Sequence, residues 1–253
     1  MKSWRAPEIF RPFSRNVIVY DGPSQLTGDP ILVIASAQNG NRKIGKMVQL
    51  WIMLRDISPI EAVKTGLDAA VCGDCPFRGD GTHRVCYVEY WRAVQNIWSA
   101  RQRAIPMPSS VFASRVKLQQ IPLRVAAYGD PGAVPMHVWE PLLDVTPAWT
   151  SYTHQWRWLP DVYKGFCMAS VDSVEEQALA ASRGWRTYRV RAEDEPMLAT
   201  EVVCPASDDG GKRVKCSDCA LCRGTSRAAK HVVIAAHGDG ALHFVPVQAL
   251  RHA

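Results

Sequence analysis

The cysteines are the residues of this chain whose type and spacing most clearly predict chemistry. Seven of the eight fall in two groups, and Cys167 stands apart from both. In the central group, Cys72 and Cys75 form a C-x2-C pair, and Cys86 follows after a ten-residue loop that contains His83. The C-terminal group has the spacing C-x11-C-x2-C-x2-C and consists of Cys204, Cys216, Cys219 and Cys222. Thiols at such short spacing are typical of metal ligands.

The C-terminal group supplies four thiolates, which is enough to complete the coordination of a zinc ion or a [4Fe-4S] cluster. Three cysteines at two-residue gaps resemble the first ligands of a bacterial ferredoxin, and Cys204 precedes Pro205 as the last ferredoxin cysteine precedes its proline. The spacing therefore favours iron and sulfur, with zinc as the alternative. We expect either metal to stabilise a segment that is too polar to form its own core.

The central group has three thiols and no obvious fourth ligand. A [4Fe-4S] cluster held by Cys72, Cys75 and Cys86 has one iron without a protein thiolate, and that iron can bind a substrate or cofactor. A zinc ion held there has an open position for an activating water. Alternatively, His83 or Cys167 completes a closed structural site. The sequence leaves both alternatives open.

Length and composition indicate an ordered α/β protein. The chain has 253 residues, of which 47% are hydrophobic, so it can form one large domain or two small ones. The formal charge of +6 favours a polyanionic partner such as a nucleic acid or nucleotide, although the basic residues are spread along the chain. No signal peptide or run of eighteen apolar residues is visible, so we expect no membrane partner and a cytoplasmic location. Thiols are reduced in that compartment, which favours metal ligands over disulfides.

Hydrophobic patterning predicts alternating strands and helices. Strands are predicted at 31–36, 47–54, 123–128, 149–152, 165–170, 185–190, 231–236 and 241–247. Helices are predicted from the Ser58 cap to about residue 70, at 87–98, from Pro135, and from the Ser173 cap to Gly184. Residues 105–120 are expected to be a linker with a short helical turn.

This alternation predicts a mostly parallel sheet, either open or curled into a partial (β/α) barrel. We expect an irregular N-terminal segment at 1–30, an α/β domain with the central cysteine loop at 31–196, and a cysteine-rich metal-binding appendage at 197–253. Oligomeric state is not predictable from these patterns.

A turn after the predicted strand at 123–128 is the candidate cofactor site. Ligand groups gather at the carboxyl ends of parallel strands, and Gly129, Asp130 and Pro131 occupy that position. Asp130 is the candidate catalytic residue, since it can bind an amine or hydroxyl group. The same residues are also explained by turn formation alone. His154 and Asp172 are expected to have structural roles, the second as part of a helix cap.

Several segments between residues 45 and 240 resemble a family of uncharacterised actinobacteriophage proteins, the gene product 88-like family. The matching pieces are EAVKTG, CGDCPFR, CYV, GDPGAVP, WTSYTHQW, MASVDS, GWRTYRV and the C-terminal C-x2-C-x2-C. The resemblance implies a phage-encoded protein in the host cytoplasm. It implies no particular activity.

A more distant similarity is to radical S-adenosylmethionine enzymes. It implies a partial barrel with the central cysteines as the cluster ligands, the Gly129-Asp130-Pro131 turn as the site for the methionine amine, and the C-terminal cysteines as an auxiliary cluster. The gap before Cys86 departs from the usual C-x3-C-x2-C spacing of those enzymes.

Two functions therefore follow as hypotheses. The first is a cysteine-ligated metalloprotein with iron-sulfur radical chemistry on an unknown substrate, with S-adenosylmethionine as cofactor. The second is a zinc-stabilised module that binds nucleic acid or a host protein without catalysis, in which the aromatic stretch 149–158 can stack on bases.

Overall fold

The computed structural model describes residues 15–36, 42–78 and 84–244 and has a mixed α/β fold with two largely parallel sheets. The first sheet has the order β4-β1-β2-β3-β5-β6. β1 (Val17–Pro23), β2 (Pro30–Ser36) and β3 (Val48–Leu54) are antiparallel neighbours. From β3 onward the sheet is parallel, through β5 (Leu123–Tyr128) to β6 (Trp149–Thr150), and β4 (Ile105–Pro106) pairs in parallel with β1 at the other edge.

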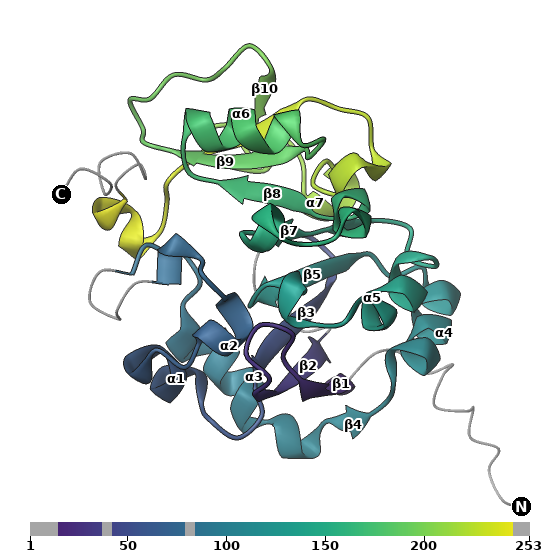
Figure 1. The fold of residues 1–253 in the computed structure, drawn as a ribbon. Coiled ribbons are helices and arrows are strands. Elements are labelled where there is room, and N and C mark those ends of the chain that lie inside the picture. Colours follow the sequence, from purple (N-terminus) through teal and green to yellow (C-terminus); the bar gives the residue numbers. More distant parts are fainter. Residues whose placement is uncertain (1–14, 37–41, 79–83, 245–253) are drawn as a thin grey trace, which may run out of the picture.

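The second sheet is parallel throughout and has the order β10-β11-β9-β8-β7. Its strands are β7 (Tyr152–Thr153), β8 (Met168–Val171), β9 (Thr187–Arg191), β10 (Glu201–Val203) and β11 (His231–Ala235). One residue, Ser151, separates β6 from β7. Its N–H donates to the Cys222 carbonyl at 2.9 Å, and its carbonyl accepts from the Met168 N–H at 2.9 Å. The two sheets therefore meet at Ser151. Figure 1 shows β5 of the first sheet next to β7 of the second.

The helices lie around these sheets. They are α1 (Pro59–Thr65), α2 (Ala69–Cys72), α3 (Gln95–Ser99), α4 (Ser109–Gln119), α5 (Met136–Leu143), α6 (Val174–Ser182) and α7 (Cys216–Cys219). A π-helical turn, Tyr90–Val94, leads directly into α3. Figure 1 shows α1, α2 and α3 on one side of the first sheet, α4 and α5 together on another, and α6 across β8 and β9.

Short 3-10 turns connect many of these elements. They are Pro76–Arg78, Arg101–Arg103, Pro131–Ala133, Gln155–Arg157, Asp161–Gly165, Gly224–Ser226 and Asp239–His243. The predicted strand at 241–247 is therefore wrong for its described part, because residues up to 243 belong to the last of these turns. Its remainder lies outside the described residues.

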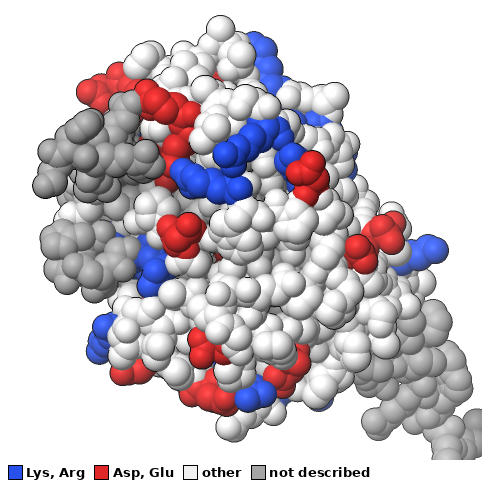
Figure 2. All heavy atoms as spheres, viewed as in Figure 1, with Lys and Arg blue, Asp and Glu red and all other residues white. Residues whose placement is uncertain are grey.

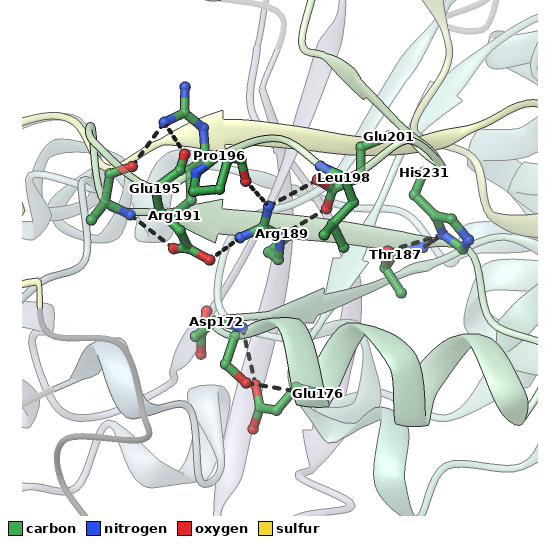
Figure 3. Close-up of polar contacts among 12 residues, drawn as sticks. Asp172, Glu176, Thr187, Arg189, Arg191, Glu195, Pro196, Leu198, Glu201 and His231 are labelled. Carbon is green, nitrogen blue, oxygen red and sulfur yellow. Dashed lines mark hydrogen bonds and ion pairs between the residues drawn. The ribbon is translucent and has the colours of Figure 1, made fainter.

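Helix caps form as the sequence predicts. The Ser58 hydroxyl accepts from the Glu61 N–H at 3.2 Å, and the Ser173 hydroxyl accepts from the Glu176 N–H at 3.2 Å. The Glu176 side chain reaches back to the Asp172 N–H at 3.0 Å, which completes a capping arrangement (Figure 3). α1 is shorter than predicted because Gly66 adopts a left-handed conformation and ends it.

Two segments form more regular structure than their sequences indicate. Residues 17–23 are part of β1, with Val17 and Val19 buried, so the prediction of an irregular segment at 1–30 is wrong there. Residues 109–119 form α4, with Phe112 and Val116 buried, and not a linker. In both cases burial against the rest of the chain stabilises an element whose own pattern is weak.

The C-terminal segment is part of the second sheet, where β10 and β11 continue from β9. Arg189 on β9 is fully buried and donates to both carboxylate oxygens of Glu201 on β10, at 2.7 and 2.8 Å. It also contacts Glu195 and donates to the Pro196 carbonyl at 3.1 Å (Figure 3). At the other end of β9, the Thr187 N–H donates to His231 Nδ1 at 3.0 Å. Residues 197–235 are thus held to the sheet by strand pairing and by buried side chains.

The molecular surface carries mixed charge. On the face shown in Figure 2, Lys and Arg side chains are interspersed with Asp and Glu. Arg157, for example, pairs with Glu176 at the start of α6. Among the described helices, none combines the length and the apolar character needed to cross a lipid bilayer.

Candidate metal centres

A cavity of about 350 Å³ lies between the two cysteine groups. It is lined by every clustered cysteine, namely Cys72, Cys75, Cys86, Cys204, Cys216, Cys219 and Cys222. Gly129 and Asp130 line it as well. Two groups that are more than a hundred residues apart in the sequence therefore face one cavity. None of their thiols forms a disulfide.

The central thiols are positioned by a tightly bonded loop. Cys72 is the last residue of α2, and the Cys75 N–H donates to its carbonyl at 3.3 Å. The Cys86 N–H donates to the Phe77 carbonyl at 3.0 Å, which brings the end of the loop back beside its start. His83 lies outside the described residues, so its role as a ligand stays a prediction.

A buried carboxylate holds this loop together. Asp68, at the start of α2, is 1% exposed and accepts from Arg78 Nε at 2.9 Å and from Arg84 Nη1 at 3.1 Å. Arg78 also donates to the carbonyls of Gly73 and Gly66. The backbone on both sides of the thiols is therefore fixed by side-chain contacts to one anion.

The central thiols interact electrostatically. Burial raises the pKa of Cys72 well above its ordinary value, and neighbouring Cys75 and Cys86 raise it further. Burial likewise raises the pKa of Cys86, while Arg84 lowers it through its charge and a hydrogen bond. Such thiols are protonated at neutral pH, and a bound metal cation would displace their protons.

The candidate cofactor turn packs against the central loop. Gly129 has φ +83°, and a Cβ there would lie 2.7 Å from Ile52 Cβ and 3.1 Å from the Val71 carbonyl oxygen. The Asp130 N–H donates to that Val71 oxygen at 2.6 Å. The turn after β5 therefore lies against the residue that precedes Cys72, and glycine is required for this approach.

Asp130 is engaged by its own chain. Its Oδ1 accepts from the Gly132 N–H and the Thr153 hydroxyl, each at 2.8 Å, and its Oδ2 accepts from the His154 N–H at 2.8 Å. Burial raises its pKa, and these hydrogen bonds oppose the rise. The contacts accord with the interpretation that the Gly-Asp-Pro turn has a backbone role. A role for Asp130 toward a ligand stays a prediction.

His154 lines the cavity and Asp172 lies behind it, in positions that the sequence does not reveal. His154 follows β7, and its Nε2 lies 3.5 Å from Oδ2 of Asp172, which follows β8 and is 1% exposed. Burial lowers the pKa of His154, but Cys75 and Asp172 outweigh it, so that the pKa is raised well above its ordinary value. Asp172 thus faces His154 with its side chain, whereas Ser173 provides the helix cap. The one feature of the sequence that could have indicated their proximity is that each residue follows one of two neighbouring parallel strands.

The C-terminal thiols are positioned mainly by backbone hydrogen bonds. Cys204 directly follows β10, and its N–H donates to the Val233 carbonyl at 2.9 Å. Its own carbonyl lies so close to Gly210 that a Cβ there would be 2.1 Å away. At α7, the Cys216 N–H donates to the Lys43 carbonyl at 3.0 Å, and Cys222 accepts from Ser151. These contacts connect the C-terminal group to both sheets.

The four C-terminal thiols also interact with one another. Burial raises the pKa of Cys222, and Cys204, Cys216 and Cys219 raise it further, while a hydrogen bond from Tyr152 lowers it. Burial raises the pKa of Cys216, and Arg124 and Lys43 lower it. Cys204 and Cys222 belong to the small apolar cluster of the second sheet.

Cys167 belongs to neither group. Its Sγ lies 3.0 Å from the Ser151 hydroxyl, and it is fully buried in the main core. Across the described ranges, no three His, Cys, Asp or Glu side chains stand in the geometry of a coordinated metal ion.

These features combine clustered thiols, a cavity, and polar groups at the carboxyl ends of parallel strands. Comparison of the chain with protein-family models, with curated proteins and with solved structures gives no significant match.

Proposed function

We propose that this chain is an iron-sulfur protein with two cysteine-ligated centres, one closed and one open to a small-molecule cavity. The observation that carries the proposal is the arrangement of seven thiols in two interacting groups around one space of about 350 Å³. Cavities of roughly 300 to 1,000 Å³ are typical of small-ligand sites.

The central group would be the open centre. Cys72, Cys75 and Cys86 supply three thiolates, which leaves one iron of a [4Fe-4S] cluster for a substrate or cofactor. The positive charge of Arg84 lowers the pKa of the Cys86 thiol, and Cys75 raises the pKa of His154, so each of these basic residues is electrostatically coupled to a central cysteine. Hydrogen bonds to cluster sulfurs and burial from solvent tune the reduction potential of such a centre.

The C-terminal group would be the closed centre. Cys204, Cys216, Cys219 and Cys222 supply four thiolates, which satisfies every iron of a cubane cluster. Backbone hydrogen bonds connect this group to Lys43, Ser151 and Val233. A cluster bound there would therefore help to hold the two sheets together.

The strand arrangement supports a partial (β/α) barrel as the framework. Parallel pairing continues from β3 through β5, the segment on both sides of Ser151, β8 and β9 to β11. Asp130, His154 and Asp172 each follow one of these strands at its carboxyl end, where barrel enzymes carry their ligands.

Radical chemistry with S-adenosylmethionine is the activity that fits this combination. A cluster held by these thiols, once reduced by an external one-electron donor, would supply the electron for cleavage of the sulfonium cofactor, as in the radical enzymes that the sequence distantly resembles. The chain's own residues would hold the cluster through the central thiols and exclude bulk water from the cavity. We would expect such a reaction in an infected host cell, as the resemblance of the sequence to actinobacteriophage proteins implies.

The test is metal and spectroscopic analysis of anaerobically purified and reconstituted protein. We expect about four irons per centre, a broad absorbance near 400 nm, and a reduced-state EPR signal, part of which changes when S-adenosylmethionine is added. Cys75→Ala should remove the part that responds to the cofactor, and Cys219→Ala should remove the other part. Cys167→Ala is the matched control and should retain both. Colourless protein with stoichiometric zinc would contradict the proposal and favour the zinc-stabilised binding module.

A further inference from the structure

We propose that the cavity contains an anion subsite centred on Arg124, which binds a carboxylate or phosphate group of a small substrate between the two cysteine groups. The inference deepens the proposed function by naming its substrate class. It nevertheless stands on residues other than the metal ligands, so it can be tested separately.

Arg124 is well placed for this role. It is the second residue of β5, at the junction of the two sheets, and its side chain lines the cavity. Its Nη2 donates to the Tyr87 hydroxyl at 2.5 Å. Within the part of the chain that the structure describes, no carboxylate lies within ion-pair distance of Arg124, and its other guanidinium nitrogens have no hydrogen-bond partner. A guanidinium has five N–H donors, so most of its binding capacity is unused.

Arg124 is half-buried, and it differs from three buried arginines of the protein. Arg189 has two glutamates, and Arg84 has Asp68. Arg186 pairs with no carboxylate of the described residues but donates to four backbone carbonyls, those of Leu221, Gly224, Ala229 and Lys230. Arg124 thus differs from these three in lacking both an acid and a ring of carbonyls.

The surroundings of Arg124 favour an added anion. Although burial opposes charge on Arg124, its pKa is raised and the guanidinium stays protonated. Burial raises the pKa of Tyr152 and Tyr188 well above the ordinary value, so both phenols are neutral. An anionic ligand would engage the unused N–H donors of this half-buried guanidinium in charge-assisted hydrogen bonds.

Aromatic rings provide walls for the rest of such a ligand. Tyr152 and Tyr188 meet edge to face with centroids 4.7 Å apart, and Tyr87 stacks on His237 at 5.2 Å. All four side chains line the cavity beside Arg124. The planar guanidinium of Arg124 can form two parallel hydrogen bonds to a carboxylate or phosphate. Because aromatic rings flank it, the site suits an aromatic acid or an aromatic phosphate ester.

Calorimetric titration of the reconstituted protein tests the proposal with benzoate, phenyl phosphate and the neutral isostere benzamide. We expect one or both anions to bind at least tenfold more tightly than benzamide, and the preferred anion identifies carboxylate or phosphate as the natural group. Arg124→Gln should abolish this preference, and Arg124→Lys should retain part of it. Arg103→Gln, which changes an exposed arginine, is the control and should bind like the unaltered protein.

Three results would overturn the subsite. The first is equal binding of benzoate, phenyl phosphate and benzamide. The second is unchanged anion binding by Arg124→Gln. The third is selective loss of the C-terminal metal from Arg124→Gln, together with no anion preference in the unaltered protein. The last result would make Arg124 the counter-ion of Cys216 and its neighbours. Anion preference in protein that holds no iron would instead support the subsite while contradicting the iron-sulfur proposal.

Discussion

The two cysteine groups face the same cavity but are held in different ways. The central thiols lie on a loop that is fixed by side-chain contacts, above all those of Asp68 with Arg78 and Arg84. The C-terminal thiols lie at the end of β10 and on and after α7, where backbone hydrogen bonds connect them to both sheets. Two of them, Cys204 and Cys222, are also part of an apolar cluster.

This difference indicates that the two cysteine groups have different roles. A centre that is built into strand pairing has little freedom to change its coordination without loss of structure. A centre on a loop held by ion pairs can accept a ligand while the sheets stay intact. We therefore expect the C-terminal centre to contribute to stability and the central centre to reactivity.

The largest expected effect compares one cysteine of each group. Cys219→Ala should destabilise the metal-loaded protein by about 5 kcal/mol, because loss of a structural metal removes its binding free energy from folding. Cys75→Ala should cost about 1 kcal/mol, since the sheets do not depend on the loop. Anaerobic chemical denaturation, followed by circular dichroism, measures both. Equal losses of unfolding free energy in the two variants would contradict the proposed difference in role.

The second prediction concerns the buried pair that anchors β10. Glu201→Gln leaves Arg189 without its bidentate partner and should destabilise the protein by about 3 kcal/mol. The variant should also lose the C-terminal metal before the central one during chelator titration, because Cys204 follows β10. Glu193→Gln changes an exposed acid on the same connection and serves as the control. Simultaneous loss of both metals would show that the two centres are not independently supported.

The third prediction concerns the turn beside the central loop. Gly129→Ala places a Cβ against Ile52 and the Val71 carbonyl at a positive φ and should cost about 2 kcal/mol. Gly28→Ala is a matched control, since Gly28 has φ +85° but no atom within 4 Å of the added Cβ. The difference between the two variants in thermal unfolding isolates the steric part. If Gly129→Ala leaves the EPR signal of the central group unaltered, the turn does not influence that group.

Much of the fold could be predicted from local patterns. The apolar runs of β2 and β3, the alternation in β5, and the caps at Ser58 and Ser173 are all recognisable in the sequence because they depend on neighbouring residues. α4 could not be predicted, because its stability comes from packing of Phe112 and Val116 and not from a regular amphipathic pattern.

The site could be predicted only in its parts. Cysteine spacing identified two groups, but nothing local indicates that they face one cavity, since that follows from how the sheets meet at Ser151. Arg124 gives no signal, because an arginine in an alternating strand is expected at the surface. His154 and Asp172 are separated by seventeen residues, and their approach depends on the pairing of β7 with β8.

The bonds from Cys216 and Ser217 to the carbonyls of Lys43 and Ile44 set a limit on when the cavity can form. One wall is synthesised early and the other late, so the enclosure is incomplete until residues beyond 222 have left the ribosome. A ligand that needs both walls of this cavity must therefore bind after the C-terminal cysteine group has folded against the loop before β3.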